Sequence, residues 1–137
     1  MLRDNYITVY NIYRNKDGEN ETFNRTILFV HLEENTGKRD DKTSEASTST
    51  LTLFVPFHSQ NECKKSYVEP EVYMKLSDHS QIFTFKKGDI VVKGQLKEDI
   101  TSEKEFILRH PEALRIKKCD TNNFGGPAMR HWEVCCD

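Results

Sequence analysis

The sequence contains no apolar run that approaches the roughly 20 residues a membrane-spanning helix needs. Its first residues, MLRDNYITVYN, also lack the basic segment followed by an apolar core that marks a secretory signal. We therefore expect a protein made and kept in the cytoplasm, with no membrane partner. At 137 residues the chain is long enough for one hydrophobic core and too short for two, which predicts a single β-rich domain over 1–137.

An excess of one charge is also missing. The chain has 20 Lys and Arg against 22 Asp and Glu, so its formal net charge is −2. This balance gives no whole-molecule attraction to nucleic acid or to an anionic membrane. Hydrophobic residues make up 36% of the chain and gather in short runs, which predicts a folded domain instead of a disordered one.

Cysteine is scarce, and its spacing fits neither a metal site nor a disulfide framework. Cys63 and Cys119 stand alone, whereas structural zinc sites present their ligands in closely spaced pairs. Cys135 and Cys136 are adjacent, and one trans peptide aims their side chains apart, so a bridge between them would be strained. We predict reduced thiols and no metal, with a redox or interchain role for Cys135 and Cys136 as the alternative.

The motifs of common enzyme classes are absent as well. There is no Gly-x-Ser-x-Gly sequence, no glycine-rich phosphate loop and no His-Glu-x-x-His sequence. The five histidines are scattered, and paired acids such as Glu33–Glu34 and Asp40–Asp41 are typical of solvated charge in loops. We therefore predict a protein that is not an enzyme and that carries no cofactor.

Short β-branched and aromatic runs dominate what is present. The segments Tyr6–Arg14 and Phe23–Leu32 read as strands, and Asp17–Gly18 between them supplies the positive φ of a tight turn, which predicts a hairpin. Thr50–Phe57 alternates as a third strand, which Pro56 ends or places at a sheet edge.

The second half of the chain continues the same pattern. Ile82–Phe85 and Ile90–Gly94 flank the turn Lys86–Asp89, which predicts a second hairpin. Ala113–Cys119 and Met129–Val134 read as two further strands. The spacing of strands and turns is typical of a small antiparallel β-barrel or sandwich.

Two segments favour short helices. In Tyr67–Asp78, Pro70 stands at a first helical position, and Val72, Tyr73 and Leu76 share one side. We expect this helix to cover an end of the sheet. Ser102 and Glu105 have capping-box spacing before Phe106–Leu108, where a helix or a strand fits the short apolar run. The predicted fold is thus mainly β with one or two short helices.

A long polar segment separates the second and third predicted strands. Residues 33–50 contain no large apolar side chain and mix both signs of charge with Ser, Thr, Asn and Gly. Such a segment cannot bury enough surface to offset its own ordering. We predict a flexible loop insertion over 34–49, with an insertion that orders against a partner as the alternative, because long loops in compact domains are often functional.

Aromatic strand residues beside lysines allow another interpretation, an OB-like module that binds single-stranded nucleic acid. Phe83 and Phe85 share one face of their predicted strand, and Lys86, Lys87 and Lys93 lie nearby. Exposed rings with a basic rim would form a stacking platform for bases. The same spacing is typical of core residues on an inward face, and no other segment supplies a basic groove.

Three runs carry a resemblance that spans most of the chain. They are ITVYN at Ile7–Asn11, FTFKKGDIVVKG at Phe83–Gly94 and DTNNFGGPAMRHWEV at Asp120–Val134. The sequence resembles an uncharacterised family encoded in prophages and phages of Gram-positive bacteria. Its layout is similar to that of head-closure, or stopper, proteins of the head–tail connector.

The resemblance implies a virion protein at the head–tail junction, made in the host cytoplasm. It implies a ring of identical subunits that contacts the portal or adaptor and the tail end, with the polar loop in the channel against packaged DNA. The candidate channel-loop residues are Glu34, Asn35, Lys38, Arg39, Asp40, Asp41, Lys42 and Ser49. A tail terminator, or another ring protein at the tail end, is the alternative.

The motif MRHWEV supplies a second candidate site. The candidate subunit-interface residues are Arg130, His131, Trp132 and Glu133. Trp132 is the sole tryptophan, and its indole combines a large apolar area with one hydrogen-bond donor. On a terminal strand it anchors either the core or a neighbouring subunit, and both roles stay open.

Overall fold

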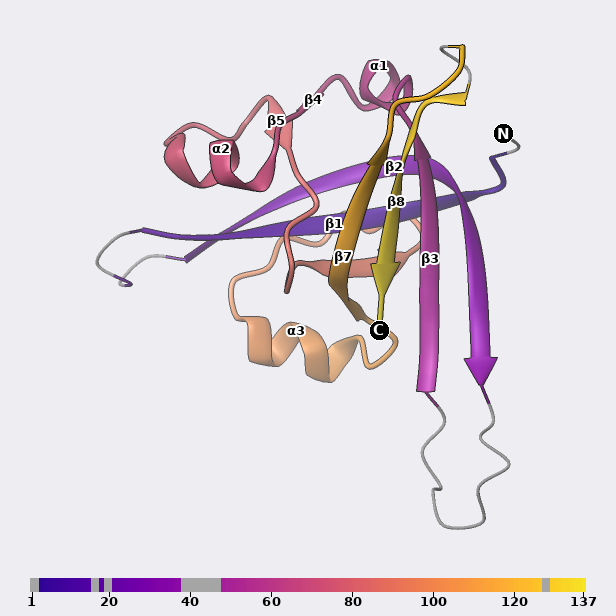
Figure 1. Ribbon diagram of the computed structural model, residues 1–137. Helices are drawn as coiled ribbons and strands as arrows, with labels where there is room; N and C mark the ends of the chain where they lie inside the picture. Colours follow the sequence, from indigo (N-terminus) through magenta and orange to yellow (C-terminus); the bar gives the residue numbers. More distant parts are fainter. Residues whose placement is uncertain (1–2, 16–17, 19–20, 38–47, 127–128) are drawn as a thin grey trace.

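The computed structural model describes residues 3–15, 18, 21–37, 48–126 and 129–137. Six strands form a closed antiparallel barrel in the order β1, β2, β3, β8, β7, β6 (Figure 1). Their bounds are β1 Asn5–Arg14, β2 Glu21–Gly37, β3 Thr48–Pro56, β6 Ile90–Lys93, β7 Leu114–Asn122 and β8 His131–Cys136. The prediction of a mainly β fold is confirmed, and of its two forms the barrel is the one observed.

The remaining elements are short and lie outside the ring of strands. β4 (Ser66–Tyr67) and β5 (Ile82–Phe83) pair in parallel. The helices are α1 (Ser59–Cys63), α2 (Pro70–Lys75) and α3 (Glu103–Arg109), and Figure 1 shows α3 on the opposite side of β1 from the other two. None of the helices in the described part of the chain is long and apolar enough to cross a membrane.

The barrel closes because β2 and β7 each change partner along their length. β2 pairs with β1 up to Val30 and with β3 from His31 onward. β7 begins against β6 and continues against β8, with a register shift between Ile116 and Lys118. A bulge of this kind bends a strand and increases its twist. Both strands thereby join the two halves of the barrel wall.

Several local predictions are confirmed. The first hairpin is β1 with β2, and β3 ends at Pro56, which has no backbone N–H to donate to a ladder. α2 starts with Pro70 in its first turn. α3 is a helix and not a strand, and its N-cap Ser102 accepts a hydrogen bond from the Glu105 N–H at 3.4 Å.

The predicted second hairpin is wrong. Ile82–Phe83 pairs with β4, whereas Ile90–Lys93 pairs with β1 and β7. β1 and β7 occupy both edges of β6, so no edge is left for Ile82–Phe83. The backbone just after β5 is held instead by a side chain of β1, because Asn11 accepts from the Thr84 N–H at 3.1 Å and donates to the Thr84 carbonyl at 2.6 Å.

Two further predictions need correction. Tyr73 is the buried residue of α2, while Val72 and the C-cap residue Leu76 are exposed, so only one of the three side chains predicted to share a side reaches the core. The polar insertion is shorter than 34–49, because β2 runs on to Gly37 and β3 already begins at Thr48.

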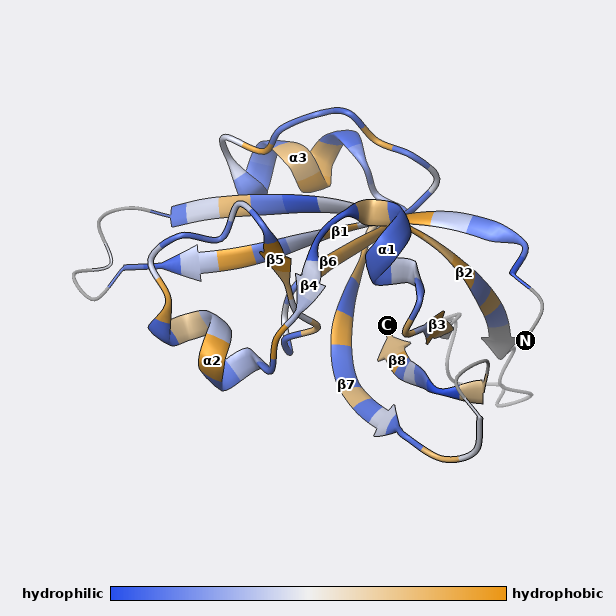
Figure 2. Ribbon diagram, turned by 90° about the horizontal axis from the view of Figure 1, so that it is seen from above, coloured by the Kyte–Doolittle hydropathy of each residue, from blue (hydrophilic) through white to orange (hydrophobic). Residues whose placement is uncertain are grey.

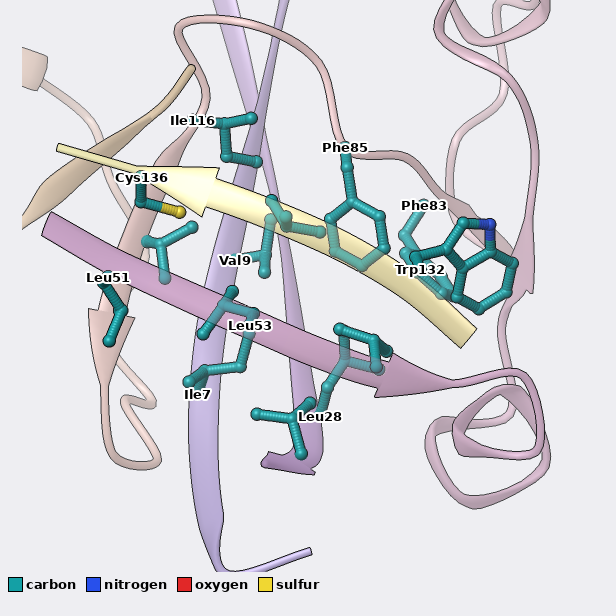
Figure 3. Close-up of a cluster of buried hydrophobic side chains, with 14 residues drawn as sticks. Ile7, Val9, Leu28, Leu51, Leu53, Phe83, Phe85, Ile116, Trp132 and Cys136 are labelled. Atoms are coloured by element: carbon teal, nitrogen blue, oxygen red, sulfur yellow. The ribbon is translucent and has the colours of Figure 1, made fainter. Parts of the chain in front are cut away.

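Alternating side chains fill the barrel. Hydrophobic and hydrophilic residues alternate along β7 in Figure 2, as expected for a strand with one face inward. The main core gathers inward residues from the barrel strands together with Phe83 and Phe85 (Figure 3). A smaller core lies under α3, where Phe106 packs against Tyr10 with ring centroids 5.1 Å apart.

A buried carboxylate fixes the turn before β6. The Asp89 side chain is fully buried and accepts from Asn11 Nδ2 at 2.8 Å, the Ile12 N–H at 3.0 Å and Lys86 Nζ at 2.9 Å. Burial raises the pKa of the Asp89 carboxyl, and the attraction of Lys86 opposes that rise. The carboxylate therefore ties β1 to the start of β6 by polar contacts that water cannot reach.

We expect Asp89→Ala to lower the free energy of unfolding by about 3 kcal/mol, because it leaves buried donors of Asn11 and Ile12 without an acceptor. The control is Asp99→Ala, which removes an ion pair with Arg25 from a side chain that is 83% exposed. Such a surface pair changes stability by less than about 1 kcal/mol. Urea unfolding of the two variants measures the difference, and equal stabilities would contradict a structural role for Asp89.

Candidate functional site

The far ends of β2 and β3 form an arm that leaves the barrel. On the side of the arm, the ladder between β3 and β8 ends at the pair Leu51↔Cys136. The ladder between β3 and β2 continues for three more pairs, Asn35↔Thr50, Thr36↔Ser49 and Gly37↔Thr48. Figure 1 shows this two-stranded extension beyond the other strands. We call residues 35–37 and 48–50 the β2–β3 arm.

The structure describes three of the eight predicted channel-loop residues. Glu34 lies on β2 at the base of the arm, and its carboxylate forms an ion pair with Lys93 of β6. Asn35 and Ser49 lie on paired strands within the arm. The remaining predicted residues lie outside the described part of the chain: Lys38, Arg39, Asp40, Asp41 and Lys42.

A hollow of about 270 Å³ opens at the base of the arm, and we call it the mouth hollow. Leu51, Val91 and Leu114 give it an apolar lining from three different strands. Glu34, Lys93 and Glu112 add charged groups. Sequence reasoning missed this hollow, because its lining residues come from segments far apart in the chain, and the motif that contains Val91 and Lys93 does not show which segments face it.

Trp132 anchors the core. Its side chain is buried near Phe83 and Phe85 (Figure 3), and its ring centroid lies 4.3 Å from that of Phe57 and 4.4 Å from that of Tyr67. β8 brings Trp132 inward together with Val134 and Cys136. Of the two roles left open for Trp132, the structure therefore shows the core one, and the part of this motif in a subunit interface stays a prediction.

The other three residues of the predicted interface stay nearer to solvent. Arg130 is exposed, whereas His131 and Glu133 are half-buried. His131 Nδ1 lies 2.9 Å from the Met129 carbonyl, and Asn122 Nδ2 lies 3.0 Å from His131 Nε2. These contacts fix the backbone where β8 begins, so the outward residues are held on a rigid strand.

The predicted stacking platform for bases is not formed. Phe83 and Phe85 are buried in the main core, with ring centroids 5.5 Å apart in an edge-to-face arrangement. Both rings pack near Trp132, as Figure 3 shows. Buried rings cannot stack on a nucleobase. Phe83 lies on β5 and Phe85 in the segment after it, and Thr84 between them is buried too.

The four cysteines are free thiols. Burial raises the pKa of both Cys119 and Cys136 to about 12, and it also raises the pKa of Cys63. A thiol reacts as its thiolate, so these three are poor nucleophiles near neutral pH. Cys63, Cys119 and Cys135 are all partly exposed, but Cys135 lies on the outer side of β8, away from the inward residues Val134 and Cys136.

The described residues do not include a group of three or more His, Cys, Asp or Glu side chains that could hold a metal ion. The best-connected titratable cluster lies at the surface, where His110 Nε2 is 2.7 Å from Glu98. Hydrogen bonding to Glu98 raises the pKa of His110. These contacts join the end of α3 to the segment before the helix, so we assign the cluster a role in holding the fold.

The fold and its surfaces define a small closed β-barrel protein with a projecting two-stranded arm. The chain belongs to a family described as "Family of unknown function (DUF6751)", and the match covers residues 2–137. No curated protein and no solved structure matches the chain.

The different burial of the thiols predicts two classes of reactivity. At pH 8 we expect an aromatic disulfide reagent to modify Cys135 much faster than Cys119 and Cys136, whose pKa is about 12. Absorbance of the released thiolate measures the rates. In Cys135→Ser the fast phase should disappear, whereas a fast phase that persists would contradict the burial of the other thiols. Unfolding in guanidinium should expose all remaining thiols equally.

Proposed function

We propose that the protein is a non-enzymatic structural subunit of a bacteriophage particle, a head–tail connector of the head-closure type that assembles into a ring. The observation that carries this proposal is the β2–β3 arm, which extends from a closed barrel by three residue pairs. A ring of barrels would hold such arms at fixed positions around a central channel. The sequence resemblance supports the same assignment.

The charge of the arm and of residues 38–47, which connect its two strands in the sequence, suits a gate that DNA can pass. Residues 35–50 include three acidic and three basic side chains. A strongly basic loop would bind the phosphate backbone tightly and in a salt-dependent way. A segment with balanced charges opposes DNA sterically without holding it strongly, which fits reversible sealing of a channel.

The barrel itself suits a rigid spacer between other proteins. Its interior is filled by buried side chains, including Leu53, Val55 and Val134, which are fully inaccessible to solvent. Close-packed interiors transmit force with little deformation. Function then depends on outer surfaces and on the arm, which explains why a subunit of this kind needs no catalytic group.

The nucleic-acid-binding module is less well supported, because the burial of Phe83 and Phe85 removes its stacking platform. A tail terminator would have the same location in the virion and a similar ring, so only its neighbours differ. Imaging of intact particles that locates this chain along the head-to-tail axis tests the proposal. Absence from purified particles, with no association when portal, adaptor and tail-end proteins are present, would overturn it.

The arm permits a specific deletion. Because Gly37 pairs with Thr48, replacing 38–47 by Asn-Gly would close the ladder with a two-residue turn and leave the barrel intact. We expect unchanged thermal stability within about 1 kcal/mol. Particles assembled with this variant should lose packaged DNA, measured as DNA that becomes accessible to nuclease.

An equally long Gly-Ser segment in place of 38–47 is the matched control, because it keeps the reach of the connection and removes its charges. DNA retention by the control and leakage by the short variant would show that reach is what matters. Normal DNA retention by the short variant would remove the arm and its connection from the sealing mechanism, while leaving the location in the virion unaffected.

A further inference from the structure

One edge of β2 has no neighbouring strand after the point where the strand changes partner. From His31 to Gly37, β2 pairs with β3 on one side. On the other side its ladder with β1 ends at Val30, opposite Asn5. Within the described part of the chain, no strand pairs with this side of β2 beyond Val30, and Figure 1 shows it on the outside of the sheet. We call this side, over residues 32–36, the open edge.

The backbone groups that face the open edge follow from the alternation along a strand. Successive residues direct their N–H and C=O groups to opposite sides of the strand. The Val30 carbonyl faces the side of β1, because it accepts from the Asp4 N–H at 3.0 Å. The even-numbered residues of β2 therefore face that side. Those on the open edge are Leu32, Glu34 and Thr36.

The two halves of β2 differ in how their unpaired edges are covered. In the first half, Ser59 Oγ and Lys65 Nζ donate to backbone carbonyls of β2. At the start of the open edge, the Asp4 carboxylate accepts from the Leu32 N–H. Among the described residues, no side chain is hydrogen-bonded to the N–H or C=O of Glu34 on this edge. Unpaired backbone groups of this kind are the ones to which an added strand binds.

The side chains along the open edge carry an excess of acid. Carboxylate oxygens of Asp4 and Glu33 lie 3.4 and 3.5 Å from the two ring nitrogens of His31, and the two acidic side chains are 44% and 61% exposed. Glu34 forms an ion pair with Lys93. Asp4 and Glu33 therefore have no Lys or Arg partner among the described side chains, which favours a basic ligand.

The charge also decides against a second copy of the same edge. If two copies paired their open edges about a two-fold axis at Glu33 or Glu34, the axis would place that glutamate directly opposite its own counterpart. Like charges that are directly opposite on paired strands are destabilising. A strand with Lys or Arg at the facing position would be stabilised by the same carboxylates.

We propose that the open edge of β2 binds an extended, basic segment of a partner protein as an added strand. Backbone groups of Glu34 and Thr36 supply the hydrogen bonds, and Glu33 faces a Lys or Arg of the added segment. The inference goes beyond the proposed function, because this edge belongs to the barrel itself and is present in whatever assembly the chain joins.

Two short synthetic peptides serve as probes, one of alternating valine and lysine and one of alternating valine and glutamate. Both have a residue of high strand propensity at every second position and differ in charge. Each is titrated into the isotope-labelled full chain, and NMR follows the backbone amides. We expect the lysine peptide to shift the amide signals of Glu34 and Thr36 and to slow their hydrogen exchange. The glutamate peptide should bind roughly ten-fold more weakly.

A substitution at Thr36 tests the backbone contact. Thr36→Pro removes an N–H that faces the open edge and leaves the ladder with β3, to which the odd-numbered residues of β2 direct their groups. It should weaken binding of the lysine peptide by roughly ten-fold. The matched control is Thr36→Val, which keeps the N–H and the strand propensity and should bind the peptide like the wild type. Equal thermal stability of the two variants checks that the barrel is intact.

A substitution at Glu33 tests the charge contact. Glu33→Lys should reverse the preference, so that the glutamate peptide binds more tightly than the lysine peptide. The matched control is Glu71→Lys, which makes the same change at an exposed residue of α2 and should keep the preference of the wild type.

Four outcomes would overturn the inference. They are no binding of the lysine peptide at millimolar concentration, equal binding of the two peptides, equal binding by Thr36→Pro and Thr36→Val, or an unchanged preference in Glu33→Lys. Protection of the Glu34 and Thr36 amides that rises with protein concentration, without peptide, would also overturn it, because a second copy would then cover the edge. None of these results bears on the location in the virion, which particle imaging decides separately.

Discussion

The change of partner along β2 is the constraint on which the rest of the structure depends. Its first part, up to Val30, belongs to β1, and its second part, from His31, belongs to β3. This arrangement leaves an edge of the first part without a strand, and polar side chains cover it. Ser59 Oγ donates to the Phe29 carbonyl at 3.2 Å, and Lys65 Nζ donates to the Arg25 carbonyl at 2.7 Å. An edge satisfied in this way is closed to further strand pairing.

Where the chain passes between the barrel and the elements outside it, polar side chains make the hydrogen bonds that a neighbouring strand would otherwise make. Asn11 satisfies both backbone groups of Thr84, and Asp89, at the turn before β6, accepts from donors of Asn11, Ile12 and Lys86. Lys65 directs all three of its ammonium protons to oxygen atoms, while burial lowers its pKa. Each group would be costly to bury alone, so together they fix one path for the chain.

The same closure gives the two ends of the barrel different chemistry. Because β2 and β3 extend beyond β8, the arm and the mouth hollow lie at one end of the barrel. The turn between β7 and β8 lies at the other end. The interior between these two ends is filled by buried side chains, so the two ends differ in their exposed groups and not in the core.

The sequence by itself determined the β-rich class, the first hairpin, the end of β3 at Pro56 and the starts of α2 and α3, because each depends on local backbone chemistry. Only the tertiary structure decided that Trp132 and Phe83 face the core, that Ile82–Phe83 pairs with β4, and that distant residues line one hollow. Periodicity reports that one face of a strand is buried. It does not say which element covers that face, because contacts between distant segments leave no local pattern in the sequence.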